Sequence, residues 1–136
     1  MADIEPGSDV ANALQSAQLG WLTTVHDGQP QSSYVWFHFD GSDVLVLSRP
    51  DAGKVRNVRA HPRVSFHLDG DGRGGGVLTI DARAVVIEGD LDPVRLDAYL
   101  AKYDAPIRNQ LNTTPEDLRA QFSTAVFVTP ARVRSW

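Results

Sequence analysis

The residues with the clearest chemical potential are basic side chains near the middle of the chain. Positions 49 to 63 hold five basic residues and one acidic residue, a net charge of +4 in a chain whose total is −4. Pro50-Asp51 follows an apolar run and predicts a helix start, whose outward amides favour anions. A lysine so early in a helix is unfavourable by itself, which suggests that an anion completes the site. The candidate ligands for a phosphate or carboxylate are Ser48, Arg49, Lys54, Arg56 and Asn57.

The same residues have a plainer interpretation. Val55 and Val58 mark the apolar side of this helix, and Lys54 and Asn57 share another face. A basic helix of this kind can equally be a solvated surface, so the sequence leaves an anion site and a solvated face as equal alternatives.

Three other sequence patterns are weaker indications of a functional site. Gly70, Gly72 and Gly75 match the spacing of a dinucleotide-binding turn, but the β-branched run that follows predicts a strand where that turn needs a helix. A flexible hairpin loop that could cover a ligand is the better interpretation. His38 with Asp40 and His67 with Asp69 could each begin a metal site, but no third ligand is suitably spaced. We therefore predict no metal site.

Alternating and helical apolar patterns predict the elements that position these residues. Ser8 caps a predicted helix over 9–18, and Asp92-Pro93 and Thr114-Pro115 start two later helices. The predicted strands are 21–25, 31–39, 44–48, 64–68, 77–87 and 125–129. Six strands with hairpin connections predict a mainly β (α+β) fold, a six-stranded antiparallel barrel with short peripheral helices. Side chains fill a barrel of this size, so a sizeable cofactor would lie outside it or between subunits.

Composition restricts the class of protein. A chain of 136 residues is expected to form one domain over 1–136, with 1–7 as a flexible N-terminus. The chain has no cysteine, no apolar run long enough for a membrane helix and no signal-peptide pattern at its acidic start, so we expect a cytoplasmic protein with no membrane partner. A pI of about 5.4 argues against nucleic-acid binding. A solvent-exposed indole at Trp136 would leave a large apolar surface in water, so we expect this side chain to pack against other residues.

Taken together, several segments resemble the split β-barrel flavin/deazaflavin oxidoreductase superfamily, which contains pyridoxamine 5'-phosphate oxidase. The resemblance covers roughly residues 10 to 136. The short length of the chain and its Lys54-x-Arg56-Asn57 helix are most similar to the actinobacterial branch that uses coenzyme F420. The segments that carry it are Leu19 to Val25, Asp27 to Pro30, Ser33 to Phe37, Lys54 to Val58, Pro62 to Ser65 and Thr129 to Val133.

The resemblance implies a homodimer with two equivalent sites at its interface. It places the cofactor ring along Gln31, Ser32, Ser33, Tyr34, Val35 and Trp36. It assigns the phosphate and acidic tail to Ser48, Arg49, Lys54, Arg56 and Asn57. It also places Trp136 against the partner subunit, near the ring. Tyr34 departs from the pattern, because many relatives carry proline there.

The function implied by the resemblance is an F420-dependent oxidoreductase that transfers hydride to a small electron-poor organic substrate. Relatives generally have no indispensable acid or base, so we name no catalytic residue. Two alternatives stay open: an FMN-binding oxidase or reductase of the same fold, and a non-catalytic carrier or sensor of F420 or FMN. The basic helix suits the added carboxylates of F420 better than the single phosphate of FMN.

Overall fold

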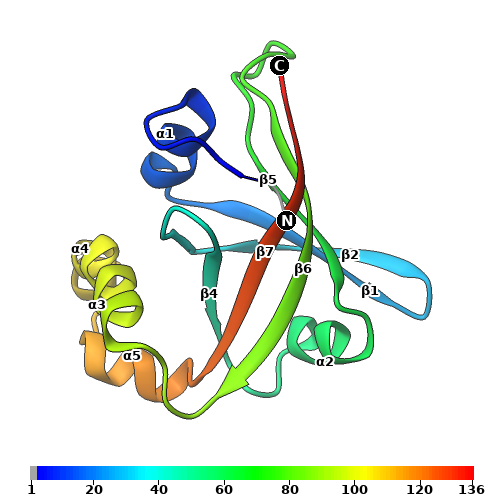
Figure 1. Cartoon of the computed structure of the whole chain (residues 1–136). Coiled ribbons are helices and arrows are strands. Elements are labelled where there is room, and N and C mark those ends of the chain that lie inside the picture. The colour runs from blue at the N-terminus through cyan, green and yellow to red at the C-terminus, as the bar shows by residue number, and fades with distance from the viewer. Residues whose placement is uncertain (1–2) are drawn as a thin grey trace.

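The computed structural model describes residues 3–136 as one antiparallel sheet that curls into a half-barrel, with short helices around it (Figure 1). The strand order is β2-β1-β5-β6-β7-β4-β3, and every neighbouring pair is antiparallel. The strands are β1 (Gly20–His26), β2 (Gln29–Val35), β3 (His38–Phe39), β4 (Val44–Ser48), β5 (Arg63–Leu68), β6 (Leu78–Glu88) and β7 (Thr124–Ser135). The predicted fold class is confirmed.

Five helices surround the sheet, and none of them is long and apolar enough to cross a bilayer within residues 3–136. They are α1 (Asp9–Ser16), α2 (Gly53–Ala60), α3 (Pro93–Lys102), α4 (Asp104–Asn109) and α5 (Pro115–Gln121). Ser8, Asp92 and Thr114 accept hydrogen bonds from backbone amides at the starts of α1, α3 and α5, as their sequence patterns predict.

The predicted strand count was wrong, because the segment 31–39 forms two strands instead of one. The backbone leaves the ladder at Trp36 and Phe37, and the backbone groups of Phe37 bond to two side chains at the C-terminal end of α3 (Pro93–Lys102). The Phe37 amide donates to the Tyr103 hydroxyl at 2.8 Å, and its carbonyl accepts from the Lys102 ammonium at 2.8 Å. These side chains take the place of a neighbouring strand, so β2 ends at Val35 and the sheet has seven strands.

The last strand is longer than predicted and reaches nearly to the end of the chain. Asp81 pairs with Arg132 and Ala82 with Pro130, so Ala131 forms a bulge that accommodates a proline in the strand. Beyond β7, the backbone of Trp136 exchanges two hydrogen bonds with Val77, at 2.9 and 3.1 Å. The C-terminus is therefore paired with the sheet.

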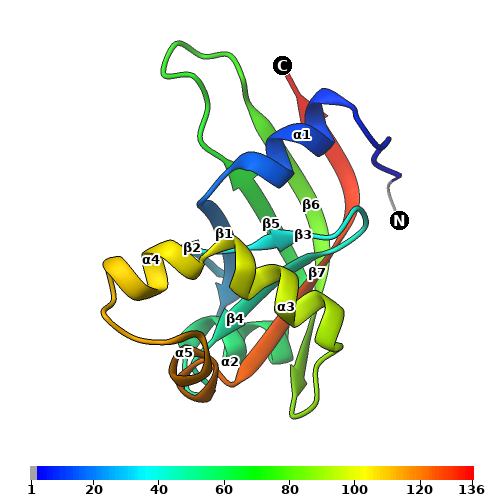
Figure 2. The same ribbon diagram turned by 90° about the vertical axis from the view of Figure 1, so that its left-hand side faces the viewer.

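Apolar side chains form two clusters on opposite faces of β4 and β7. The larger cluster fills the concave side of the sheet around Phe37, Phe66 and Val46. The smaller one lies between the other face and helices α3 to α5, which Figure 2 shows grouped on one side of the molecule, and it includes Tyr103 and Phe127. Because β4 is covered on both faces, all five of its residues are buried.

Candidate functional site

A cavity of about 320 Å³ opens where the end of β2, the start of α2 and the group of helices α3 to α5 come together. Its walls are aromatic and aliphatic, and one basic side chain reaches into it. The lining residues are Tyr34, Val35, Trp36, Leu47, Lys54, Tyr99, Leu111, Leu118 and Phe122. A mostly apolar hollow with a single charged group is the usual form of a small-molecule site.

The break between β2 and β3 positions the strand side of this cavity. Trp36 lies at the break and stacks on Tyr103 with ring centroids 4.5 Å apart and an angle of 1° between the rings. The Tyr103 hydroxyl also lies 2.8 Å from the carbonyl oxygens of Gln18 and Phe37, and burial raises the pKa of this phenol to about 12. The neutral phenol therefore holds Trp36 and the strand break in one arrangement.

Lys54 is the charged group of the cavity. It is the second residue of α2 and is half-buried, and burial lowers the pKa of its ammonium. No hydrogen bond or ion pair joins this ammonium to any residue from 3 to 136. A partly desolvated cation without a counter-charge is costly, so an anion that enters the cavity would gain from pairing with it.

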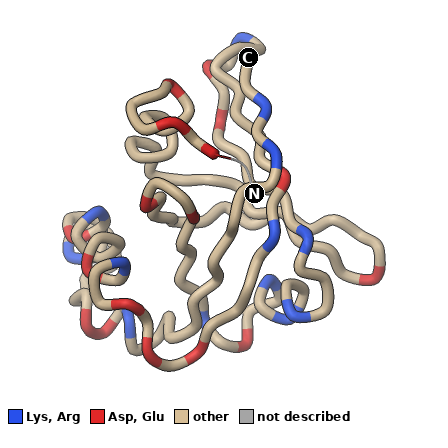
Figure 3. Tube along the Cα trace, in the orientation of Figure 1, with Lys and Arg blue, Asp and Glu red and all other residues tan. Residues whose placement is uncertain are grey.

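The start of α2 supports this site. Figure 3 shows basic residues gathered along α2. No side chain caps the first turn of α2. The Val55 amide donates to the Ala52 carbonyl at 3.1 Å, whereas the amides of Gly53 and Lys54 make no hydrogen bond within residues 3–136. The Arg56 guanidinium donates to the carbonyl oxygen of Asp51 at 2.6 Å and therefore lies against this helix start.

Two predicted ligands, Ser48 and Arg49, lie at the C-terminal end of β4, just before α2. Ser48 is buried, and its hydroxyl donates to the carbonyl oxygen of Arg49 at 3.0 Å. The exposed Arg49 guanidinium lies 5.1 Å from the centre of the Phe122 ring and bonds to Gln121 at 3.3 Å. Arg49 therefore contacts Phe122, a wall residue of the cavity, but is not itself a lining residue.

Asn57 and Gln31 have partners within the fold. The buried Asn57 amide nitrogen lies 3.0 Å from the Thr24 hydroxyl and 3.0 Å from the Gln31 side-chain oxygen, and donates to both. These bonds attach α2 to β1 and β2. Asn57 therefore sets the position of Lys54 relative to the strand that carries Tyr34.

The other predicted residues of β2 lie beside β1. The Ser32 hydroxyl is 2.8 Å from the Thr23 hydroxyl, and the half-buried Ser33 pairs with Leu22. Tyr34 is 46% exposed, stacks on Trp21 with ring centroids 4.4 Å apart, and donates from its hydroxyl to Asp69 at 2.6 Å. Tyr34 is thus fixed in the cavity wall.

Trp136 lies away from this cavity, at the end of the chain. Its indole is 66% exposed although its backbone is paired with Val77. The expectation that it packs on a partner subunit stays a prediction.

Several wall residues escaped the sequence analysis. Tyr99, Leu118 and Phe122 follow the helical apolar spacing, which indicates only that they pack against the sheet, yet all three also line the cavity. Leu111 lies after α4, in a segment with no periodic signal, and is 50% exposed. Leu47 was expected as part of a buried strand, and nothing in its pattern indicates a cavity.

The weaker sequence patterns lie in the β5–β6 loop and in or directly after strands β3 and β5 of the described chain. Gly70 to Gly76 lie in the loop that joins β5 to β6, as the hairpin interpretation predicted. Within residues 3–136, no group of three or more histidine and acidic side chains is placed to hold a metal ion. Asp69 instead accepts from Trp21 and Tyr34.

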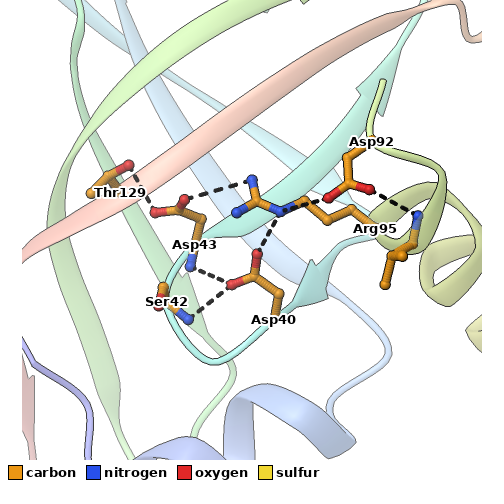
Figure 4. Close-up of polar contacts among 7 residues, drawn as sticks. Asp40, Ser42, Asp43, Asp92, Arg95 and Thr129 are labelled. Carbon is orange, nitrogen blue, oxygen red and sulfur yellow. Dashed lines mark hydrogen bonds and ion pairs between the residues drawn. The ribbon is translucent and has the colours of Figure 1, made fainter. Parts of the chain in front are cut away.

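A separate cluster of charged side chains surrounds Arg95, and none of its residues lines this cavity (Figure 4). Arg95 of α3 lies 3.1 Å from Asp40 and 3.9 Å from both Asp43 and Asp92. Asp43 also accepts from the Thr129 hydroxyl at 2.9 Å. Each of these groups has a partner, so the cluster attaches α3 to the β3–β4 turn and to β7.

Comparison with known proteins agrees with this architecture. The sequence model of the family described as pyridoxamine 5'-phosphate oxidase matches residues 8–136. General stress protein 26 of Bacillus subtilis (strain 168) is 25% identical over 117 residues, which are 81% of this chain and 84% of that protein.

Three solved structures have the same fold. A conserved hypothetical protein from Mycobacterium tuberculosis is 26% identical with a TM-score of 0.73, over 100% of this chain and 88% of that one. A structure described as an F420 reductase is 22% identical with a TM-score of 0.71, over 96% and 98% of the two chains. A FAD-binding protein from Mesorhizobium loti is 20% identical with a TM-score of 0.67, over 90% and 87%.

Proposed function

Because the chain belongs to the pyridoxamine 5'-phosphate oxidase family, we propose that it is an oxidoreductase that uses coenzyme F420 to reduce a small electron-poor organic substrate. The observation that carries this proposal is Lys54, a half-buried cation without a counter-charge in an aromatic cavity. F420 combines a planar ring with a phosphate and a glutamate tail, and therefore matches both features. A similar fold described as an F420 reductase supports the choice.

The residues of the cavity have distinct parts in this proposal. Tyr34, Val35 and Trp36 form the apolar edge along which the ring lies, and Tyr103 keeps Trp36 in place. Lys54, the amides at the start of α2, and Arg56 would bind the phosphate, while Arg49, which contacts the wall residue Phe122, would meet the carboxylates of the tail. When bound, the reduced deazaflavin supplies a hydride, and a neutral acceptor takes up a proton from water as well. No residue is assigned as the acid or base.

A homodimer is part of the proposal. The cavity is open to solvent on one side, and Tyr34, Val85 and Trp136 expose large apolar surfaces that association would cover. Light scattering at micromolar concentration is expected to give twice the 14.9 kDa of one chain. Removal of residues 133–136 is expected to weaken dimerisation or cofactor binding. A monomeric full-length chain, or a truncated chain with both properties unchanged, would contradict the shared site.

The cofactor is tested by titration. The purified protein is titrated with F420 and with FMN, and binding is followed by cofactor fluorescence. We expect tighter binding of F420, and oxidation of reduced F420 that depends on an added acceptor. Tight F420 binding with no acceptor-dependent oxidation would favour a carrier or sensor.

FMN is the second candidate cofactor. A FAD-binding protein shares this fold, and FMN also carries a ring and a phosphate that could meet Lys54. It lacks the additional carboxylates that would engage Arg49. Binding of FMN that is tighter than binding of F420 would decide for a flavin enzyme.

A further inference from the structure

A second cavity, of about 380 Å³, shares the Tyr34 side chain with the first. It lies beside the C-terminal end of α1, and the end of β5 and Gly76 of the glycine-rich loop also line it. Its walls include the apolar residues Ala17, Leu19 and Leu68. Asp69 is the one charged side chain among its lining residues in the described part of the chain.

The Asp69 carboxylate makes two hydrogen bonds within the fold and keeps acceptor positions for a ligand. One oxygen accepts from the Trp21 indole at 3.0 Å and the other from the Tyr34 hydroxyl at 2.6 Å. These two hydrogen bonds lower the pKa of the Asp69 carboxyl, so it is ionised at neutral pH. An ionised carboxylate has about four acceptor positions, and two of them are used. The other two are available to a ligand.

The surroundings of Asp69 also favour positive charge. Tyr34, whose ring is stacked on Trp21 and is 46% exposed, lines the cavity and places an electron-rich aromatic ring next to the carboxylate. Trp21 itself lies between Tyr34 and His67 and meets Asp69 through its N–H edge. Ser16 and Ala17, at the negative end of the α1 dipole, line the same cavity, and the last turn of α1 has no basic residue. The carboxylate, the Tyr34 ring and the helix end thus select for the same sign of charge.

We propose that this second cavity binds the cationic or N–H-donating end of a planar organic ligand, with Asp69 as the residue that determines its specificity. The two cavities meet at Tyr34, so a ligand held by Asp69 lies next to the first cavity. Only the further step of calling this ligand the hydride acceptor rests on the proposed function. The contrast with Lys54 gives the molecule one cavity for anions and a neighbouring one for cations.

The test uses two probes with the same bicyclic ring, N-methylquinolinium and quinoline, at about pH 8, where quinoline is uncharged. Binding is followed by the indole N–H signals in proton–nitrogen correlation spectra, and Trp21→Phe identifies the signal of Trp21. We expect the cation to shift the Trp21 signal and to bind about fivefold more tightly than quinoline, as an exposed charge pair allows.

Variants separate the charge from the shape of the cavity. Asp69→Asn is expected to abolish the preference for the cation, and Asp69→Glu to retain it. Asp71→Asn is the matched control, because it removes a carboxylate of the same loop that does not line the cavity and leaves an acceptor for the amides of Arg73 and Gly75. Equal affinities for both probes, or an unmoved Trp21 signal, would overturn the proposal.

The experiment is done without any flavin or deazaflavin. A cation-selective Trp21 shift in a protein that binds neither F420 nor FMN would refute the proposed function and leave the second cavity established. F420 binding without cation selectivity would support the proposed function and refute the cation site at Asp69.

Discussion

Two cations of this chain, Arg95 and Lys54, occupy opposite situations. Arg95 lies among three carboxylates, one of them at 3.1 Å, and its guanidinium also lies 5.1 Å from the centre of the Phe127 ring. Lys54 is half-buried in a cavity, and no carboxylate of residues 3–136 pairs with it. Charges whose partners lie within the fold stabilise it, whereas a charge without a partner is available to a ligand. Sequence patterns do not make this distinction, because both residues lie early in short helices.

The largest expected effect is on ligand binding, through Lys54→Ala. Loss of one charge-assisted contact costs about 1.5–3 kcal/mol, or about a tenfold to hundredfold loss of F420 affinity at low salt. The melting temperature is expected to stay close to that of the wild type, and added salt to narrow the difference in affinity. Cofactor fluorescence and thermal melts measure the two quantities.

Arg59→Ala is the control for Lys54. Arg59 lies on the same helix and pairs with Glu88 at 2.9 Å, on an exposed surface outside the cavity. Its loss is expected to change F420 affinity less than twofold. Equal affinities for the wild type and Lys54→Ala would return α2 to the solvated basic face that the sequence also allowed.

The converse effect is expected for Arg95→Met, which leaves three carboxylates without their shared cation. We expect the free energy of unfolding to fall by about 1–2 kcal/mol, with F420 affinity unchanged. Urea denaturation measures the loss. Arg108→Met, which removes the exposed pair with Asp104 at 3.1 Å, is the control and should cost about 0.5 kcal/mol or less. A similar cost for the two variants would mean that the Arg95 cluster contributes no more than an ordinary surface pair.

Lys102 gives a smaller, pH-dependent effect. Burial lowers the pKa of its ammonium to about 8, below the ordinary lysine value of about 10.4. Between these two values the unfolded chain binds a proton that the folded chain has released, so Lys102 makes stability rise with pH in that window. The stability of the wild type relative to Lys102→Met should increase by about 1 kcal/mol from pH 8 to about 10.5, since partial solvation reduces the full linkage. A flat difference in urea denaturation across this range would contradict the assignment.

The smallest expected effect is the pH dependence of the Lys54 site. Burial lowers the pKa of Lys54 in the free protein, and a bound anion would raise it again. F420 affinity is therefore expected to be constant at mildly alkaline pH. It should weaken as the pH rises through the pKa of the Lys54 ammonium in the ligand-free protein. Lys54→Ala should lack this decline. A decline of the same size in the variant would assign it to another group.

Much of the fold follows from local patterns. Ser8, Asp92 and Thr114 form the side-chain caps that their spacing predicts, because a cap involves neighbours within three residues. The run 44–48 is a strand buried on both faces, as its continuous apolar character indicates. Helix α4 was not predicted, since its six residues include Pro106 and have no clear apolar period.

Part of the candidate site also follows from the sequence. Tyr34, Val35, Trp36 and Lys54 were all predicted, and all line the first cavity. Asn57 was predicted as a ligand, and the structure shows its amide nitrogen bonded to Thr24 and Gln31. The sequence of α2 contains no sign of these partners, because they lie 33 and 26 residues away.

By itself, the sequence determined the mainly β class, the helix starts and the basic face of α2, since apolar period, turn residues and caps act over a few neighbours. Only the tertiary structure decided that the predicted strand 31–39 breaks at Trp36 and Phe37, because the groups that satisfy Phe37 lie 65 and 66 residues further along the chain. The same holds for the partners of Arg95 and Asp69, and for the lack of a partner for Lys54 within residues 3–136. Whether a charge is paired depends on which distant side chains the fold brings within about 4 Å, and no local pattern contains that distance.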